Sequence, residues 1–249
     1  FINSFTPDGE VSTLPTVSAA KVFFGTSRGT LYCLSTEDIQ IPIWSKNYKS
    51  GITTSIAFED DNFCFGTDNG VLYNISSNTG KTLWVKRLHS GLKENIVITE
   101  DSVYCMTKSH VLYAVSKKEG IIKWNLSSWD RLITGPVVSG NHVFVSADTR
   151  LFMIAADSGH ILWSHDFIRE IRWFSASMGK VFAVCRDKNI YCLVSEPYIK
   201  FDPKILNFGS FKKAAKETVH LLIKNTTDKK VTVKLKTNDN WYKLPEGII

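Results

Sequence analysis

Short apolar segments separated by polar turns run along the first 195 residues. Five of these segments are rich in Val, Phe and Tyr: Val22–Gly25, Asn62–Gly66, Val103–Met106, Val143–Ser146 and Val181–Val184. Residues of this kind suit a pleated, half-buried strand. Each segment precedes a tight polar turn such as Asp68-Asn69-Gly70, in which Asp, Asn and Gly tolerate the positive φ of a hairpin. The pattern predicts β-hairpins and lacks the alternating helices of a parallel α/β fold.

Aromatic residues repeat along the same region with a period close to 40. One series is Trp44, Trp84, Trp124 and Trp163, and a second is Tyr32, Tyr73, Tyr113, Phe152 and Tyr191. Four short strands in each unit of about 40 residues are typical of a β-propeller blade. We expect each tryptophan to pack between adjacent blades, where one large ring buries about 150–250 Å². The predicted fold class is therefore all-β, with about five four-stranded blades.

The best copies of the unit are Leu72–Trp84, Leu112–Trp124 and Phe152–Trp163, each with a glycine four residues before its tryptophan. They resemble the tryptophan-docking repeat of pyrroloquinoline-quinone (PQQ)-type β-propellers, and the resemblance covers residues 1–195. Leu31–Trp44 is a weaker copy, and Val181–Val194 lacks the final turn and the tryptophan. Two alternatives follow for the ring of blades. Phe1–Phe5 could supply the missing outer strand of the fifth unit and complete the ring. Alternatively, further blades could precede Phe1 in a longer chain.

The pattern changes after Ser195. Residues Phe201–Gly209 are followed by an alternating segment, Lys230–Lys236, and by Trp241 near the end. This order resembles the first half of immunoglobulin-like modules of the Hydin and major-sperm-protein type. A full sandwich has roughly 100 residues, so we expect a partial immunoglobulin-like β domain over residues 196–249 after a propeller over residues 1–195.

Charge is distributed unevenly along the 249 residues. The net charge is +6, and the segment from residue 200 onward holds 11 lysines against 5 acidic residues. The body before it is therefore neutral, which argues against a nucleic-acid partner. No apolar run approaches the roughly 20 residues of a membrane-spanning helix, so no such segment is expected in this chain.

The five cysteines are Cys33, Cys64, Cys105, Cys185 and Cys192, and all lie in apolar, strand-like runs. We expect them to be buried, unpaired thiols that act as small apolar side chains. Unpaired cysteines favour a reducing compartment such as the cytoplasm, although they do not define the localisation.

Signatures of catalysis are absent from the sequence. It contains no G-x-S-x-G, GxxxxGK[ST], GxGxxG or HExxH motif and no CxxC pair. The repeat also resembles that of PQQ-dependent dehydrogenases, which implies a vicinal disulfide and a calcium site. No two cysteines are adjacent here, and no catalytic residue of those enzymes can be carried over. We therefore expect no enzymatic activity, no cofactor and no metal.

Recognition on a propeller is expected at the loops of one face. The turns between second and third strands and the linkers that enter each blade should share that face. The linkers hold two tryptophans outside the aromatic series, with arginines beside them, and the candidate partner-binding residues are Trp129, Arg131, Arg169, Arg172 and Trp173. Large aromatics and arginine are common interface anchors.

One other interpretation of these residues stays open. Both tryptophans could pack on neighbouring loops, with the arginines paired to Glu170 and Asp187. The predicted function is a non-enzymatic scaffold that binds a protein or peptide. The alternative is a sensory or ligand-binding propeller in a larger signalling or surface protein, with a quinone-dependent dehydrogenase third.

Overall fold

The structure is a computed structural model that describes residues 3–127, 131–177, 179–194, 199–202 and 222–225. Every regular element in these residues is a β-strand, and the strands are numbered β1 to β21. The chain divides into two compact units, Phe1–Leu193 and Val194–Ile249.

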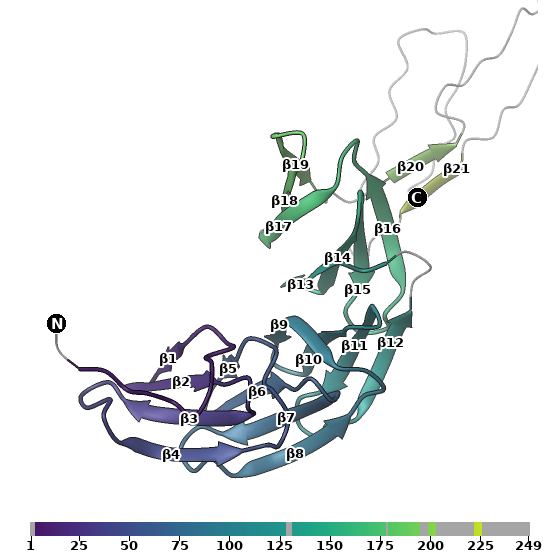
Figure 1. Ribbon diagram of the computed structural model, residues 1–249. Helices are drawn as coiled ribbons and strands as arrows, with labels where there is room; N and C mark the ends of the chain where they lie inside the picture. The colour runs from purple at the N-terminus through teal and green to yellow at the C-terminus, as the bar shows by residue number, and fades with distance from the viewer. Residues whose placement is uncertain (1–2, 128–130, 178, 195–198, 203–221, 226–249) are drawn as a thin grey trace, which may run out of the picture. The chain divides into compact units, whose positions relative to one another are not determined.

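The first unit contains five antiparallel sheets in which each strand pairs with its neighbours in sequence (Figure 1). The first two sheets are β1 (Thr16–Ser18), β2 (Lys21–Gly25), β3 (Thr30–Ser35), β4 (Pro42–Asn47), then β5 (Ala57–Glu59), β6 (Asn62–Gly66), β7 (Val71–Ser76), β8 (Thr82–Arg87). The next two are β9 (Leu92–Ile98), β10 (Ser102–Thr107), β11 (Val111–Ser116), β12 (Ile122–Ser127), then β13 (Thr134–Ser139), β14 (His142–Ala147), β15 (Arg150–Ala155), β16 (Ile161–Asp166). The fifth sheet has three strands in the described residues, β17 (Ile171–Ser177), β18 (Lys180–Cys185) and β19 (Ile190–Val194). These sheets are the predicted blades.

The hairpin between the second and third strands of each blade turns at the predicted residues. Gly70 has a φ of +83°, and its N–H donates to the Thr67 carbonyl at 3.1 Å. In later blades His110, Asp148 and Lys188 take the positive φ at the corresponding turn. A left-handed residue is what a tight hairpin needs, so these turns set the register of each blade.

The repeated tryptophans dock between blades as predicted. A Cβ added to Gly120, in the turn after β11, would lie 2.9 Å from Cδ2 of Trp84 in the preceding blade. Gly80 faces Trp44 and Gly159 faces Trp124 in the same way. The indole Nε1 of Trp84 donates to the Lys117 carbonyl at 2.7 Å, and that of Trp124 donates to the Ala156 carbonyl at 2.9 Å. Each turn can thus accept the flat indole ring, because the glycine that faces the ring has no side chain.

The core consists of apolar layers between successive sheets. One cluster joins Tyr104 and Leu112 of the third blade to Val143 and Val145 of the fourth. In the second to fifth blades, the entry residue is a buried aliphatic that belongs to such a layer: Ile52, Leu92, Leu132 and Ile171. These four residues repeat with the period of the blades and were not recognised in the sequence.

Two sequence expectations are wrong. Residues 3–5 contain no strand, so the described part of Phe1–Phe5 does not complete the fifth blade. Instead, Phe5 packs edge-on against Tyr32 of the first sheet, with ring centroids 5.1 Å apart. Cys192 is exposed, whereas the other four cysteines are buried. It differs because no following sheet covers β19 in the described residues.

The second unit is described over β20 (Ile199–Asp202) and β21 (Leu222–Asn225), which pair antiparallel with Ile199 opposite Asn225. The segment Lys230–Lys236 and Trp241 lie outside the described residues. The immunoglobulin-like module therefore stays a prediction.

Candidate functional site

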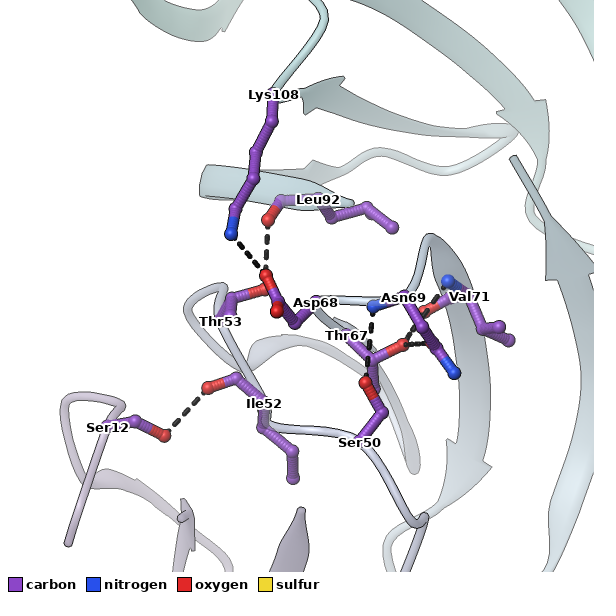
Figure 2. A network of polar contacts seen from close by, with 10 residues as sticks. All are labelled: Ser12, Ser50, Ile52, Thr53, Thr67, Asp68, Asn69, Val71, Leu92 and Lys108. Atoms are coloured by element: carbon purple, nitrogen blue, oxygen red, sulfur yellow. Dashed lines mark hydrogen bonds and ion pairs between the residues drawn. The ribbon is translucent and has the colours of Figure 1, made fainter. Parts of the chain in front are cut away.

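The hairpin turns and the blade-entry linkers lie side by side, as expected. The backbone N–H of Asp68, in the β6–β7 turn, donates to the Gly51 carbonyl of the linker that enters its blade, at 2.9 Å. Lys108 N–H donates to the Gly91 carbonyl at 2.7 Å in the next blade. The side chains of Lys108 and Asp68 form an ion pair between the two turns (Figure 2). Turns and linkers of adjacent blades therefore share one surface.

In the first three blades, the side chain just after the aliphatic residue of the linker reaches forward to the next blade. Ser12 Oγ donates to the Ile52 carbonyl at 2.7 Å, and Thr53 Oγ1 donates to the Leu92 carbonyl at 2.9 Å (Figure 2). Lys93 Nζ donates to the Leu132 carbonyl at 3.3 Å. We call this place the forward donor position. Ile133 holds it in the fourth blade and Arg172 in the fifth.

Trp173 is exposed, so the interpretation that it packs on a neighbouring loop is wrong. The residue is 62% exposed, and the Arg172 guanidinium lies 5.1 Å from the centroid of its ring. The β17–β18 register shifts between Ile171 and Trp173, which is a β-bulge. A bulge re-aims side chains, and here it leaves Arg172 and Trp173 both exposed between the buried Ile171 and Phe174.

Arg169 lies in the same linker as Arg172. It is exposed beside Ile168, which is 84% exposed, and both line a shallow hollow with Thr149, Glu170 and Arg186. The alternative in which these arginines pair with Glu170 and Asp187 is wrong, because Glu170 is bound instead by Arg186 Nε at 2.7 Å.

Asp187 instead accepts a hydrogen bond from the Tyr191 hydroxyl at 2.5 Å. That bond holds the pKa of Asp187 below its ordinary value.

Arg131 belongs to a different cluster, one blade earlier. Its Nε donates to Nε2 of His110 at 3.1 Å, and Nδ1 of His110 lies 2.6 Å from the Leu132 carbonyl. Lys93 lies against the same carbonyl, and burial lowers its pKa. Trp129 lies outside the described residues. The structure therefore brings Arg172 and Trp173 into contact at the start of β17, whereas Arg169 lines a hollow in the linker before it.

Sequence reasoning missed the apolar surface next to Trp173. Trp173 pairs with Val184 and Ser175 with Phe182 across β17 and β18, so these side chains share one side of the sheet. Phe182 and Ile190 are exposed on the fifth sheet. Phe182 and Ile190 occupy the positions in the fifth repeat that Phe144 and Leu151 occupy in the fourth. Aligning the repeats could therefore have identified this apolar surface from the sequence.

The described residues offer little catalytic chemistry. They contain no group of three or more His, Cys, Asp or Glu side chains placed to hold a metal. Burial raises the pKa of the Cys33 thiol to about 11 and that of Cys105 to about 12, so both stay protonated at neutral pH. Among the same residues, no helix has the length and apolar character that crossing a membrane requires.

Comparison with solved structures shows the same fold in natural and designed proteins. The crystal structure of BamB from Moraxella catarrhalis matches with a TM-score of 0.60 and 18% identity, over 74% of this chain and 57% of that one. The computationally designed Ika8 protein matches with a TM-score of 0.64 and 18% identity, over 72% of this chain and 57% of that one. The designed Ika4 protein matches with a TM-score of 0.54 and 18% identity, over 60% of this chain and 94% of that one. The chain thus spans little more than half the length of BamB.

No curated protein matches the sequence. The family model described as outer membrane protein assembly factor BamB, a PQQ-type repeat, matches residues 40–166, just over half of the chain. This match covers the second, third and fourth blades, in which tryptophans dock on glycine turns. The chain belongs to this PQQ-type repeat family of BamB-like β-propellers.

Proposed function

We propose that this chain is a non-enzymatic scaffold that binds a polypeptide partner through the linker of the fifth blade. The observation that carries the proposal is the exposed Trp173 with the Arg172 guanidinium stacked on its ring. An exposed indole beside arginines has the composition of an interface anchor, because it offers a large apolar area and several fixed donors. Arg169 adds a second cation to this surface.

Two further points support a binding role. The family model carries the description of an outer membrane protein assembly factor, and a factor that assembles other proteins must contact them. The blades are also held by side chains that bridge from one linker to the next, as Thr53 does to Leu92. A rigid framework of this kind holds its loops in fixed positions, which is what recognition by loops needs.

The experiment is a selection of displayed random peptides on the purified chain. We expect enriched peptides that bind the wild-type chain and lose binding to the Arg172→Ala/Trp173→Ala double variant. The matched control is Arg87→Ala/Leu83→Ala, which removes another exposed arginine and another exposed apolar side chain, both on β8. Enriched peptides that bind the double variant as well as the wild type would refute this site.

A further inference from the structure

The junction between the third and fourth blades carries three nitrogen-bearing side chains that depart from the repeat. Lys93 holds the forward donor position, where the second blade has the uncharged Thr53. His110 takes the left-handed position of its turn, with a φ of +64°, where the second blade has Gly70. Arg131 directly precedes the buried aliphatic residue of its linker, a place held by glycine in the second and third blades. We call Lys93, His110 and Arg131 the basic cluster.

The basic cluster meets at the carbonyl of Leu132. Nδ1 of His110 lies 2.6 Å from this oxygen, and Nζ of Lys93 lies 3.3 Å from it. Because a carbonyl can only accept, the neutral imidazole carries its proton on Nδ1, and Nε2 is left as an acceptor. Nε of Arg131 donates to that Nε2 at 3.1 Å. His110 therefore holds the Arg131 guanidinium on one side, and its Nδ1 lies 3.4 Å from the Lys93 ammonium on the other.

The fold does not need these charges at the junction. One blade earlier the same connection is made without a charge, because Thr53 Oγ1 donates to the Leu92 carbonyl at 2.9 Å. The left-handed turn also costs a histidine conformational energy that a glycine does not spend. Strained residues of this kind cluster at binding sites. The three departures converge on one point, which indicates a binding role for the basic cluster.

No carboxylate neutralises the basic cluster in the described part of the chain. One N–H of Lys93 bonds Leu132 and one N–H of Arg131 bonds His110, and their other N–H groups make no hydrogen bond or ion pair with a described residue. Glu94 is exposed and forms no ion pair with Lys93. Burial lowers the pKa of Lys93, Glu94 opposes this shift, and the charge of Arg131 adds to it. A bound anion would relieve both the lost hydration of the ammonium and the repulsion between the two cations.

Cations at the equivalent turns of other blades pair with carboxylates. Three pairs show this arrangement: Lys108 with Asp68 (Figure 2), Arg150 with Asp166 at 2.6 Å, and Arg186 with Glu170 at 2.7 Å. The basic cluster has the same donors without the carboxylate. It lies between two blades that the structure describes, on the surface that turns and linkers share.

We infer that the basic cluster binds a carboxylate carried by an acidic segment of a polypeptide partner. The terminal nitrogens of Arg131 donate in parallel to the two carboxylate oxygens, and Lys93 contributes the second charge. His110 is a positioning residue, because it holds the guanidinium through Nε and leaves the terminal nitrogens to the ligand. This site lies one junction before the fifth-blade linker, so it goes beyond the proposed function and does not depend on Trp173.

The test compares two fluorescent Gly-Ser peptides, one with three Glu and one with three Gln, by fluorescence anisotropy on the full chain at low salt. We expect the Glu peptide to bind about tenfold more tightly, which corresponds to about 1.4 kcal/mol. In Lys93→Thr/Arg131→Gln the two peptides should bind equally. Threonine preserves the forward bond that Thr53 makes, and circular dichroism checks that the sheets of this variant have formed.

The matched control is Lys81→Gln/Lys180→Gln. It removes the same net charge from two exposed lysines, one between β7 and β8 and one at the start of β18, at the strand ends opposite to the basic cluster. This variant should keep the tenfold preference for the Glu peptide. Loss of the preference in the control as well would mean that only the net charge matters, and the inference would fail.

Acetylation of Lys93 reports on the site directly. Its lowered pKa leaves more of the amine unprotonated near neutral pH than an ordinary lysine has, so brief acetylation followed by mass spectrometry should detect it. A saturating Glu peptide should slow the reaction at Lys93 and leave the rate at Lys81 unchanged.

Several outcomes would overturn the inference. They are equal binding, or no binding, of the Glu and Gln peptides, a preference that survives Lys93→Thr/Arg131→Gln, and acetylation of Lys93 at an unchanged rate under saturating Glu peptide. Displacement of the peptide by inorganic phosphate or citrate, where sodium chloride of equal ionic strength has no effect, would assign the site to a small anion instead. A preference that is lost only in Arg172→Ala/Trp173→Ala would place acid recognition on the fifth-blade linker, so the proposed function would stand while this inference fails.

Discussion

Replacing Gly120 by alanine tests two roles of this docking glycine: it adopts a left-handed backbone conformation, and it leaves room for the Trp84 ring. Gly120 has a φ of +70°, and a Cβ there would lie 2.9 Å from both Cδ2 and Cε3 of Trp84. The left-handed conformation alone costs an alanine about 1–2 kcal/mol. Crowding of a packed ring adds about 1–3 kcal/mol, because the turn and the indole must move apart. We therefore expect the free energy of unfolding to fall by about 2–5 kcal/mol.

Gly140 is the matched control, because it isolates the cost of the backbone conformation. It also has a positive φ, +57°, but a Cβ there would meet no atom within 4 Å. Gly140→Ala should therefore lower the free energy of unfolding by only about 1–2 kcal/mol. Urea unfolding followed by far-UV circular dichroism measures both variants on the same scale.

A double-mutant cycle attributes the extra loss to the indole. If Trp84 causes the crowding, Gly120→Ala should cost less in a Trp84→Phe background, with a coupling of about 0.5–3 kcal/mol. Equal losses for Gly120→Ala and Gly140→Ala, or no coupling with Trp84, would refute the docking of the ring on this turn.

Three further results are expected. Trp124→Ala should lower the free energy of unfolding by about 3–5 kcal/mol, and Trp163→Ala by less, because in the described residues Trp124 docks on a glycine turn of the next blade and Trp163 does not; urea unfolding compares them. In the free, folded chain, mass spectrometry after brief alkylation should find Cys192 modified well before Cys64, whose thiol is buried and has a raised pKa. The Thr30 hydroxyl lowers the pKa of Asp8 below 3.8 in the folded chain, so the ionised carboxylate contributes stability above about pH 4 that is lost as the pH falls through the lower, folded pKa. Asp8→Asn should remove this part of the acid dependence in melts between pH 5 and about pH 2, and an unchanged profile would contradict it.

Much of the fold could be predicted because its determinants are local. A turn such as Asp68-Asn69-Gly70 specifies a hairpin through its own backbone preferences, and the glycine–tryptophan spacing marks the outer strand of each blade. The docking of Trp84 between blades also followed, because a periodic large aromatic must be buried against something that repeats. Exposure of Trp173 could be tested only by the structure, since a bulge in β17 decides which way the ring points.

The errors arose where packing depends on the neighbouring sheet. Cys192 lies in an apolar run like Cys33, and the sequence around the two is similar, yet within the described residues a following sheet covers Cys33 and not Cys192. Residues 3–5 look like a strand but pack as a cover on Tyr32, because the side of the first sheet offered an aromatic surface to Phe5. Composition alone does not distinguish these cases.

The proposed anchors Arg172 and Trp173 occupy positions of the repeat that hold small polar residues in the first two blades. In the first two blades the two residues after the linker aliphatic are small and polar, and Thr54 accepts a hydrogen bond from the Gly66 N–H at 2.8 Å beneath the next linker. A tryptophan at Thr54 would fill the space that Leu92 occupies and would disrupt that junction. The same substitution at the fifth blade displaces nothing in the described residues, because no linker packs over Val184 there. At this blade a guanidinium and a large aromatic stand where the first two blades have small polar residues, and this difference singles out Arg172 and Trp173 as the proposed anchors.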